Sequence, residues 1–238
     1  MNIVIPLAGK GTRFPKNEYP LPKPLIKIQG KPMIQHAIES LGLSGRFYFI
    51  INDDEHSMEL TNLLTILKPG SEILPINYTT KGPASSCILF KSYINNSEEL
   101  VIANCDQIMW WDSDLFLAAA RIDKYDGVVV TYSESTPHNS YAKIDNRGRV
   151  ELIKEKEVIS NISLNGIHYW RKGADFVFSY EQMVRNKDTA PNGEYYVGPT
   201  YNYLIQMGRT IGIHHIPNQQ HNPVGKPDDL QAFLSKTC

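Results

Sequence analysis

The chain has few cysteines, no excess charge of either sign and no long apolar run, and each absence excludes a class of protein. Cys87, Cys105 and Cys238 have no short paired spacing, which excludes a zinc knuckle and a disulfide framework. The 24 basic and 25 acidic residues nearly cancel, so neither nucleic acid nor an anionic membrane is an expected partner. No apolar run approaches membrane-spanning length, and no basic and apolar leader follows Met1. We expect a soluble cytoplasmic protein, either a monomer or a homodimer.

Apolar periodicity predicts one α/β domain over residues 1–238. In the first half, to about residue 135, short apolar strands alternate with amphipathic helices, which favours a parallel sheet with helices on both faces. The second half, from about 136, opens with strands joined by short polar turns. The expected strands are 3–5, 47–51, 72–76, 100–103, 127–132, 141–144, 148–153, 164–170 and 211–216. The expected helices are 33–41, 57–67, 84–93, 113–121, 172–186, 196–207 and 227–234.

Glycine and positive charge are concentrated in one stretch, the run Ile-Pro-Leu-Ala-Gly-Lys-Gly-Thr-Arg-Phe that ends at Phe14, followed by a Pro-Lys-Pro-Leu segment around Lys23. Glycines let backbone N–H groups approach an anion closely, and Lys10, Arg13 and Lys23 add the charge that phosphate binding needs. A dinucleotide fingerprint would have glycine at position 14 and a following helix, and a P-loop would end in Gly-Lys-Ser/Thr; neither is present. The stretch predicts a nucleotide-phosphate site, and a structural turn with incidental charges is the alternative.

Asp106 stands just after an apolar strand, so its carboxylate is expected at the C-terminal edge of the sheet, where open α/β sheets bind ligands. A carboxylate beside a triphosphate is a natural Mg²⁺ ligand, and a turn or helix-capping aspartate is the alternative. The small residues of the stretch 82–86 permit close approach of a flat base, although an ordinary helix start has the same composition.

Taken together, the Ala-Gly-x-Gly-Thr-Arg loop, Pro-Lys-Pro-Leu and the later Gly-Lys-Pro-Met resemble the motifs of nucleotidyltransferases that make sugar nucleotides and related activated head groups. The resemblance implies a Rossmann-like, three-layer α/β/α fold of the GT-A type, with a mixed, mainly parallel sheet. It also implies Mg²⁺-dependent transfer of a nucleoside monophosphate from a nucleoside triphosphate to a phosphorylated small-molecule acceptor, with release of pyrophosphate. The first half would then bind the nucleotide and the second half the acceptor.

The resemblance implies roles for particular residues. Arg13 and the glycine loop would hold the β- and γ-phosphates, and Lys23 would contact the α-phosphate and the acceptor phosphate, which makes Arg13 and Lys23 the expected catalytic residues. Asp106 would be the metal ligand. The expected nucleotide-binding residues are Leu7, Ala8, Gly9, Gly11, Thr12, Gly82, Pro83, Ala84, Ser85 and Asn104. The expected acceptor-binding residues are Lys143, Glu155, Lys156, Asn165, Gly166 and Glu194, of which Lys156 would bind the acceptor phosphate.

The sequence departs from the family pattern near its C-terminus. Many relatives carry a second metal-binding aspartate where this chain has Pro223, and a threonine where it has Lys226. Three explanations stay open: one aspartate suffices, the triphosphate holds most of the metal, or His221, Asn222 or Glu194 substitutes.

The substrates are less explicit in the sequence than the reaction. Resemblance to capsule-cluster members favours CTP and a phosphorylated non-sugar acceptor such as phosphoglutamine, and UTP or dTTP with a sugar 1-phosphate is the alternative. With no β-helix or acyltransferase domain in the sequence, we expect a minimal member of the family. A glycosyltransferase of the GT-A type is disfavoured because no Asp-x-Asp follows the fourth strand. A non-catalytic nucleotide-binding protein is disfavoured because Arg13, Lys23 and Asp106 are all present.

Overall fold

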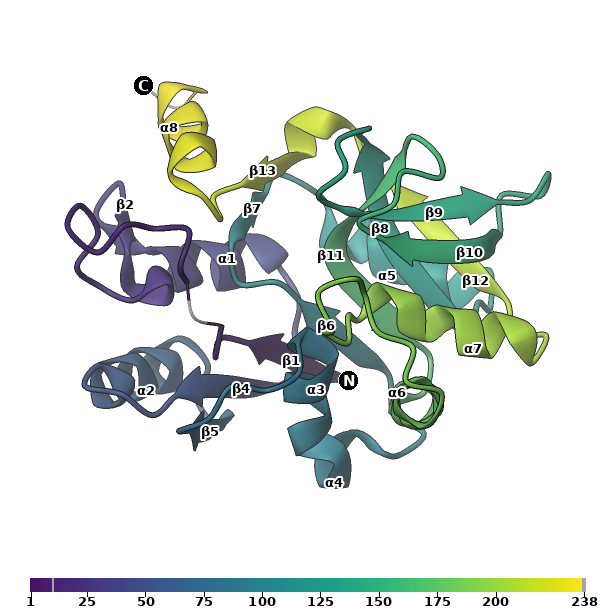
Figure 1. The fold of residues 1–238 in the computed structure, drawn as a ribbon, viewed down its shortest axis with the longest axis horizontal. Coiled ribbons are helices and arrows are strands. Elements are labelled where there is room, and N and C mark those ends of the chain that lie inside the picture. The colour runs from purple at the N-terminus through teal and green to yellow at the C-terminus, as the bar shows by residue number, and fades with distance from the viewer. Residues whose placement is uncertain (10, 237–238) are drawn as a thin grey trace.

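A nine-stranded mixed sheet forms the centre of the molecule in a computed structural model, which describes residues 1–9 and 11–236 (Figure 1). Its strands lie in the order β10-β9-β11-β6-β1-β4-β5, and β8 pairs with β11 and β12. β1 (Asn2–Pro6) is parallel to β4 (Arg46–Asn52) and to β6 (Leu100–Ala103), and β4 is parallel to β5 (Glu72–Ile76). The first half therefore has the parallel arrangement that the alternation of strands and helices predicts.

One long strand, β11 (Ile162–Trp170), joins the two halves, because it runs antiparallel to β6 and also to β8 (Gly127–Ser133). An antiparallel hairpin of β9 (Ser140–Ile144) and β10 (Val150–Glu155) continues the sheet on the side of the second half. β12 (Ile211–His215) lies parallel to β8. The predicted fold class, α/β with a mixed sheet, is confirmed.

Helices cover both faces of the sheet because alternate strand residues point to opposite sides. Ile3 and Ile5 of β1 pack towards α1 (Met33–Leu41), α2 (Ser57–Leu67) and α5 (Ser113–Ile122). Val4 packs on the other side, in a core to which the remaining central helices contribute. These are α3 (Pro83–Cys87), α4 (Lys91–Ile94), α6 (Gly173–Arg185) and α7 (Tyr201–Gln206).

A third apolar cluster fixes the C-terminal helix α8 (Pro227–Lys236) beside the N-terminal loops. In it, Val224, Leu230 and Phe233 pack against Phe14 and Met33. The cluster also holds two short antiparallel pairs next to the central sheet (Figure 1). These pairs are β2 (Lys27–Ile28) with β3 (Lys31–Pro32) and β7 (Gln107–Met109) with β13 (His221–Pro223). Residues far apart in sequence thereby meet at one edge of the sheet.

Several expected elements differ in detail from the structure. The helix predicted at 84–93 is divided into α3, a 3-10 turn at Ile88–Phe90 and α4. The helix predicted at 196–207 is α7 preceded by a 3-10 turn at Gly198–Thr200. The segment of Lys23 forms a 3-10 turn at Lys23–Leu25. A further 3-10 turn lies at Asn218–Gln220. Within the described residues, no helix combines the length and apolar character needed to cross a membrane.

Candidate functional site

Two cavities meet where β1 and β6 end. The first, which we call the loop cavity, has a volume of about 510 Å³ and is lined by the glycine loop, the segment 79–86 and Glu194. The second, the hairpin cavity, has a volume of about 330 Å³ and is lined by the loop 134–140, the β9–β10 hairpin, β11 and β13. Seven residues line both cavities and form their shared rim, namely Pro6, Arg13, Pro83, Asn104, Asp106, Tyr196 and Gly225.

The glycine loop surrounds one side of the loop cavity. Leu7, Ala8, Gly9, Gly11 and Thr12 line it, as expected for nucleotide-binding residues. Gly11 has a φ of +61°, and an added Cβ would lie 3.3 Å from the Cβ of Lys23. Glycine at this position therefore lets the loop turn tightly over the segment of Lys23. Lys10, the third cation expected in the loop, lies outside the described residues.

Lys23 and Asp106 form an ion pair at the shared rim, with the Lys23 ammonium donating a hydrogen bond to Asp106 Oδ2. Burial acts to lower the pKa of Lys23, but the neighbouring carboxylate raises it above its usual value. Burial acts in the opposite sense on Asp106, and Lys23 holds the pKa of that carboxyl below its usual value. Both groups are therefore charged in this state, and the expected metal ligand is already paired with the expected catalytic lysine.

The donor groups near Asp106 fit a magnesium ion that is held partly by substrate. No group of three or more His, Cys, Asp or Glu side chains in the described part of the chain is placed to hold a metal. Asn222 turns inward and donates from Nδ2 to the Ile108 carbonyl at 3.2 Å, and Glu194 is bonded to Tyr196. Mg²⁺ usually takes one or two carboxylates and completes its shell with phosphates and water, so Asp106 would be the carboxylate that holds it here.

The segment before α3 contributes differently from what the sequence indicates. Gly82 and Pro83 line the loop cavity, together with Ser86, the last residue of the predicted stretch 82–86. Ala84 packs in the core, and Ser85 Oγ receives a hydrogen bond from the Tyr180 hydroxyl of α6 at 2.9 Å. Because α3 begins at Pro83, neither of these two following side chains lines the cavity.

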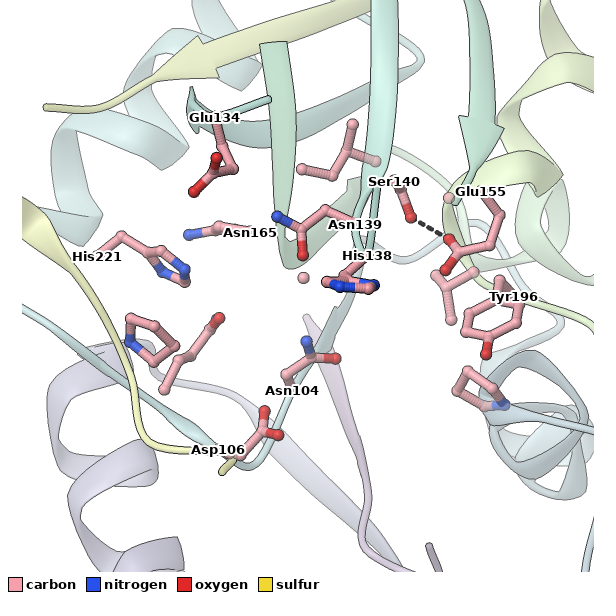
Figure 2. Close-up of a pocket in the computed structure, with 18 of the residues that line it drawn as sticks. Asn104, Asp106, Glu134, His138, Asn139, Ser140, Glu155, Asn165, Tyr196 and His221 are labelled. Carbon is pink, nitrogen blue, oxygen red and sulfur yellow. Dashed lines mark hydrogen bonds between the residues drawn. The ribbon is translucent and has the colours of Figure 1, made fainter. Parts of the chain in front are cut away.

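Gly166 and Asn104 both line the hairpin cavity and fit against one another. The register of β11 shifts between Leu164 and His168, and Gly166 in this bulge has a φ of +92°. A Cβ there would lie 2.0 Å from Asn104 Nδ2. The Asn104 N–H also donates to the Gly166 carbonyl at 3.1 Å. The bulge thus holds Asn104 at the rim, and the neighbouring Asn165 points into the cavity (Figure 2).

The structure brings only some of the expected acceptor-binding residues to the hairpin cavity. Glu155 lines it and accepts a hydrogen bond from Ser140, and burial raises the pKa of its carboxyl (Figure 2). Lys143 does not reach it, because strand residues alternate and Lys143 lies on the side opposite to Ser140. Its ammonium pairs with Glu151 at 3.3 Å.

Tyr196 separates Lys156 and Glu194 from the hairpin cavity. Lys156 donates to the Tyr196 hydroxyl at 2.7 Å and lines a neighbouring cavity of about 490 Å³. The Tyr196 hydroxyl in turn donates to Glu194 at 2.7 Å, and Glu194 lines the loop cavity. Neither of these two expected acceptor-binding residues therefore lines the hairpin cavity.

Two buried histidines line the hairpin cavity: His221, which the sequence offered only as a substitute metal ligand, and His168, which was not singled out. His221 is 8% exposed, and its ring lies 4.2 Å from that of Tyr132. Burial lowers the pKa of His221 to about 4 and that of His168 to about 3, so both rings are neutral. Nδ1 of each ring has no hydrogen-bond partner among the described residues. The pairing of β13 with β7 brings His221 to the hairpin cavity, and no local sequence signal predicts that pairing.

Solved structures share this fold over nearly the whole chain. A nucleoside-diphosphate-sugar pyrophosphorylase from Vibrio cholerae RC9 is 24% identical with a TM-score of 0.84, and the match covers 98% of this chain and 99% of that one. The inositol-1-phosphate CTP transferase from T. maritima is 16% identical with a TM-score of 0.74, over 99% of this chain and 95% of that one. The architecture is therefore one that nucleotidyltransferases use.

Residues 3–162 match the family described as the MobA-like NTP transferase domain. The chain belongs to this nucleotidyltransferase family, as the glycine-loop and Pro-Lys-Pro motifs predict. Among curated relatives, a bifunctional protein GlmU from Methanocaldococcus jannaschii is 26% identical over 235 residues, which are 97% of this chain and 52% of that protein. One from Methanococcus maripaludis is 26% identical over 251 residues, which cover 99% and 55%. The chain spans about half the length of these relatives.

Proposed function

We propose that this protein transfers a nucleoside monophosphate from a nucleoside triphosphate to the phosphate of a small acceptor and releases pyrophosphate. The observation that carries the proposal is the shared rim: Arg13 and Asp106 line both cavities, and Lys23, which lines the loop cavity, is paired with Asp106. A triphosphate in the loop cavity and a phosphorylated acceptor in the hairpin cavity would bring their reacting atoms together at this rim.

The chemistry requires positioning and charge neutralisation. An acceptor phosphate oxygen is already anionic, so it attacks the α-phosphorus without a general base; a new P–O bond forms, and the bond to the β-phosphate oxygen breaks. Lys23 neutralises charge at the α-phosphate, while Arg13 and the backbone of the glycine loop hold the departing pyrophosphate. Mg²⁺ bound by Asp106 and the phosphates would supply further charge neutralisation. Lys23 must leave Asp106 to reach the phosphate, and the arriving anion favours that exchange.

CTP is the nucleotide that we propose, and the acceptor is a phosphorylated small molecule used in capsule or surface-glycan synthesis, either a sugar or a non-sugar such as phosphoglutamine. Support comes from the sequence resemblance, and a T. maritima enzyme of the same fold is described as a CTP transferase. UTP or dTTP with a sugar 1-phosphate is the alternative, because another protein of this fold is described as UDP-glucose pyrophosphorylase. A supply of nucleoside triphosphate makes the cytoplasm the proposed location.

A pyrophosphate-release assay tests the proposal. The protein is incubated with Mg²⁺, each of the four common nucleoside triphosphates, and a panel of phosphorylated sugars, amino acids and amino alcohols. We expect acceptor-dependent release with one nucleotide strongly preferred. Lys23→Ala should lower kcat at least 100-fold, because it removes charge neutralisation in the transition state, and should change nucleotide affinity much less. Absence of release with every pair would favour a non-catalytic binding protein, and a Lys23→Ala effect confined to KM would contradict its assigned role.

A further inference from the structure

We propose that Lys226 binds the phosphate of the acceptor at the shared rim, the role that the family resemblance assigns to Lys156. This proposal rests on the proposed nucleotidyl transfer and names a residue that serves it. Lys226 follows Gly225, which lines both cavities, and Lys226 itself lines the hairpin cavity.

The distribution of charge around the hairpin cavity is the first argument. Among the described residues that line it, the lysines and arginines are Arg13 and Lys226, whereas Glu134, Glu155, Asp106 and Asp229 are acidic. Lys143 and Lys156 are engaged elsewhere, with Glu151 and with Tyr196. A phosphate that enters a cavity with so many carboxylates needs a cation at its binding point. Arg13 already faces the loop cavity as well, so Lys226 is the lysine available to the acceptor.

Packing fixes the backbone of Lys226 close to the reacting atoms. The Val224 N–H donates to the Asp106 carbonyl at 2.9 Å. Gly225 lies so close to Asp106 that a Cβ would be 2.4 Å from its Oδ2. On the other side, the Leu230 N–H donates to the Lys226 carbonyl at 3.0 Å in the first turn of α8. Val224 and Leu230 are both buried in the third apolar cluster. The lysine is thus anchored on each side, and its flexible stem extends from a fixed point.

Asp229 is the charged neighbour of Lys226 in the absence of substrate. It lies one turn further along α8 and lines the same cavity. Burial raises the pKa of its carboxyl, while Lys226 acts in the opposite sense. An acceptor phosphate carries more charge than one carboxylate, so it attracts Lys226 more strongly than Asp229 does. Arg13 at the shared rim, Lys23 in the loop cavity and Lys226 in the hairpin cavity are then available to two phosphate groups.

Binding and kinetics of Lys226 variants test the proposal. Inorganic phosphate is titrated calorimetrically into protein saturated with Mg²⁺ and the nucleoside triphosphate that the wild type binds most tightly. We expect Lys226→Ala to weaken phosphate binding at least 10-fold, as loss of a charge-assisted hydrogen bond predicts. Nucleotide affinity should stay within about 2-fold, and Lys226→Arg should retain most of the phosphate binding. Lys91→Ala, which removes a surface lysine paired with Glu181, is the matched control.

With an acceptor identified by the pyrophosphate assay, Lys226→Ala should raise KM for the acceptor at least 10-fold and leave KM for the nucleotide unchanged. Unaltered phosphate binding in Lys226→Ala, or a loss that appears in Lys156→Ala instead, would overturn the assignment. Failure of phosphate to bind the wild type would also count against it. If phosphate binding depends on Lys226 while no acceptor pair releases pyrophosphate, the binding role stands and the proposed reaction fails.

Discussion

At the scale of single residues, the buried neutral histidines have a consequence for stability. His168 is 6% exposed and stacks on Trp170 and Tyr201, with ring centroids 6.0 and 6.1 Å away. Burial lowers its pKa from 6.5 to about 3. Between these two values the unfolded chain binds more protons than the folded protein, so the free energy of unfolding falls as the pH drops from about 6.5 towards 3.

We predict that His168→Gln reduces this dependence on pH. A proton taken up only on unfolding contributes a slope of about 1.4 kcal/mol per pH unit, which the variant should lack. Urea unfolding at pH 7.5, 6.5 and 5.5 measures the slope separately from any overall loss of stability. His138→Gln, on an exposed loop, is the control. A variant slope equal to that of the wild type would show that His168 does not remain neutral in the folded protein.

Residues of the glycine loop, Lys23 and Asp106 could be located from the sequence because their signal is local. Motif spacing, together with a strand that ends just before Asp106, places them at one edge of a sheet. Lys143 shows what local signals omit: its position on β9 was predicted, but the side to which its side chain turns depends on the phase of the strand. The position of His221 in the hairpin cavity depends on the pairing of β13 with β7, which are more than a hundred residues apart in sequence.

At the scale of elements, the bulge in β11 is the feature on which the rim depends. We predict that Gly166→Ala lowers both stability and nucleotide binding, because the added Cβ would collide with the Asn104 amide and the backbone is left-handed. The expected loss of stability is about 2 kcal/mol or more. Denaturant unfolding and nucleotide titration measure the two effects.

Gly148→Ala separates the collision from backbone strain. Gly148 also has a positive φ, +75°, but no atom lies within 4 Å of the position of its Cβ. Its substitution should cost only about 1 kcal/mol and leave nucleotide binding unchanged. Equal effects of the two substitutions would mean that the contact with Asn104 contributes nothing to stability or to nucleotide binding.

Elements with clear local signals follow the sequence closely. Helix α2 and strands β5 and β6 occupy the predicted residues, because Pro69-Gly70 separates the helix from β5 and β6 is an unbroken apolar run. Strands β7 and β13 were not predicted, because three residues are too few to show a period. The break in the helix predicted at 84–93 was not predicted either, because it depends on how that segment packs on the sheet.

At the scale of the whole molecule, the two cavities have largely separate walls. We predict that a nucleoside triphosphate with Mg²⁺ slows backbone hydrogen exchange in segments 7–14 and 79–86, which line the loop cavity. Segment 134–140, which lines only the hairpin cavity, should keep its rate until an acceptor is added. Exchange followed by mass spectrometry resolves these segments. Protection of 134–140 by nucleotide alone would show that the two cavities respond together.

The alternation of strands and helices predicted the parallel half of the sheet, and the resemblance to nucleotidyltransferases predicted the mixed architecture. Neither could place α8, because its position depends on an apolar cluster that gathers Phe14, Met33 and Phe233 from both ends of the chain. The resemblance indicated that residues 221–226 lie near the metal ligand, but the packing that brings them beside Asp106 is seen only in the structure.

Strand β11 lies between β6 and β8. The rim residues Asn104 and Asp106 come directly after β6 in the sequence, and the loop 134–140 comes directly after β8. Residues that would contact the nucleotide are thus supported mainly by the first half of the sheet, and most of those that would contact the acceptor by the second. For enzyme engineering, this makes the loop 134–140 and the β9–β10 hairpin an exchangeable module. New acceptors can be sought by diversifying that module while the machinery of nucleotide activation is left intact.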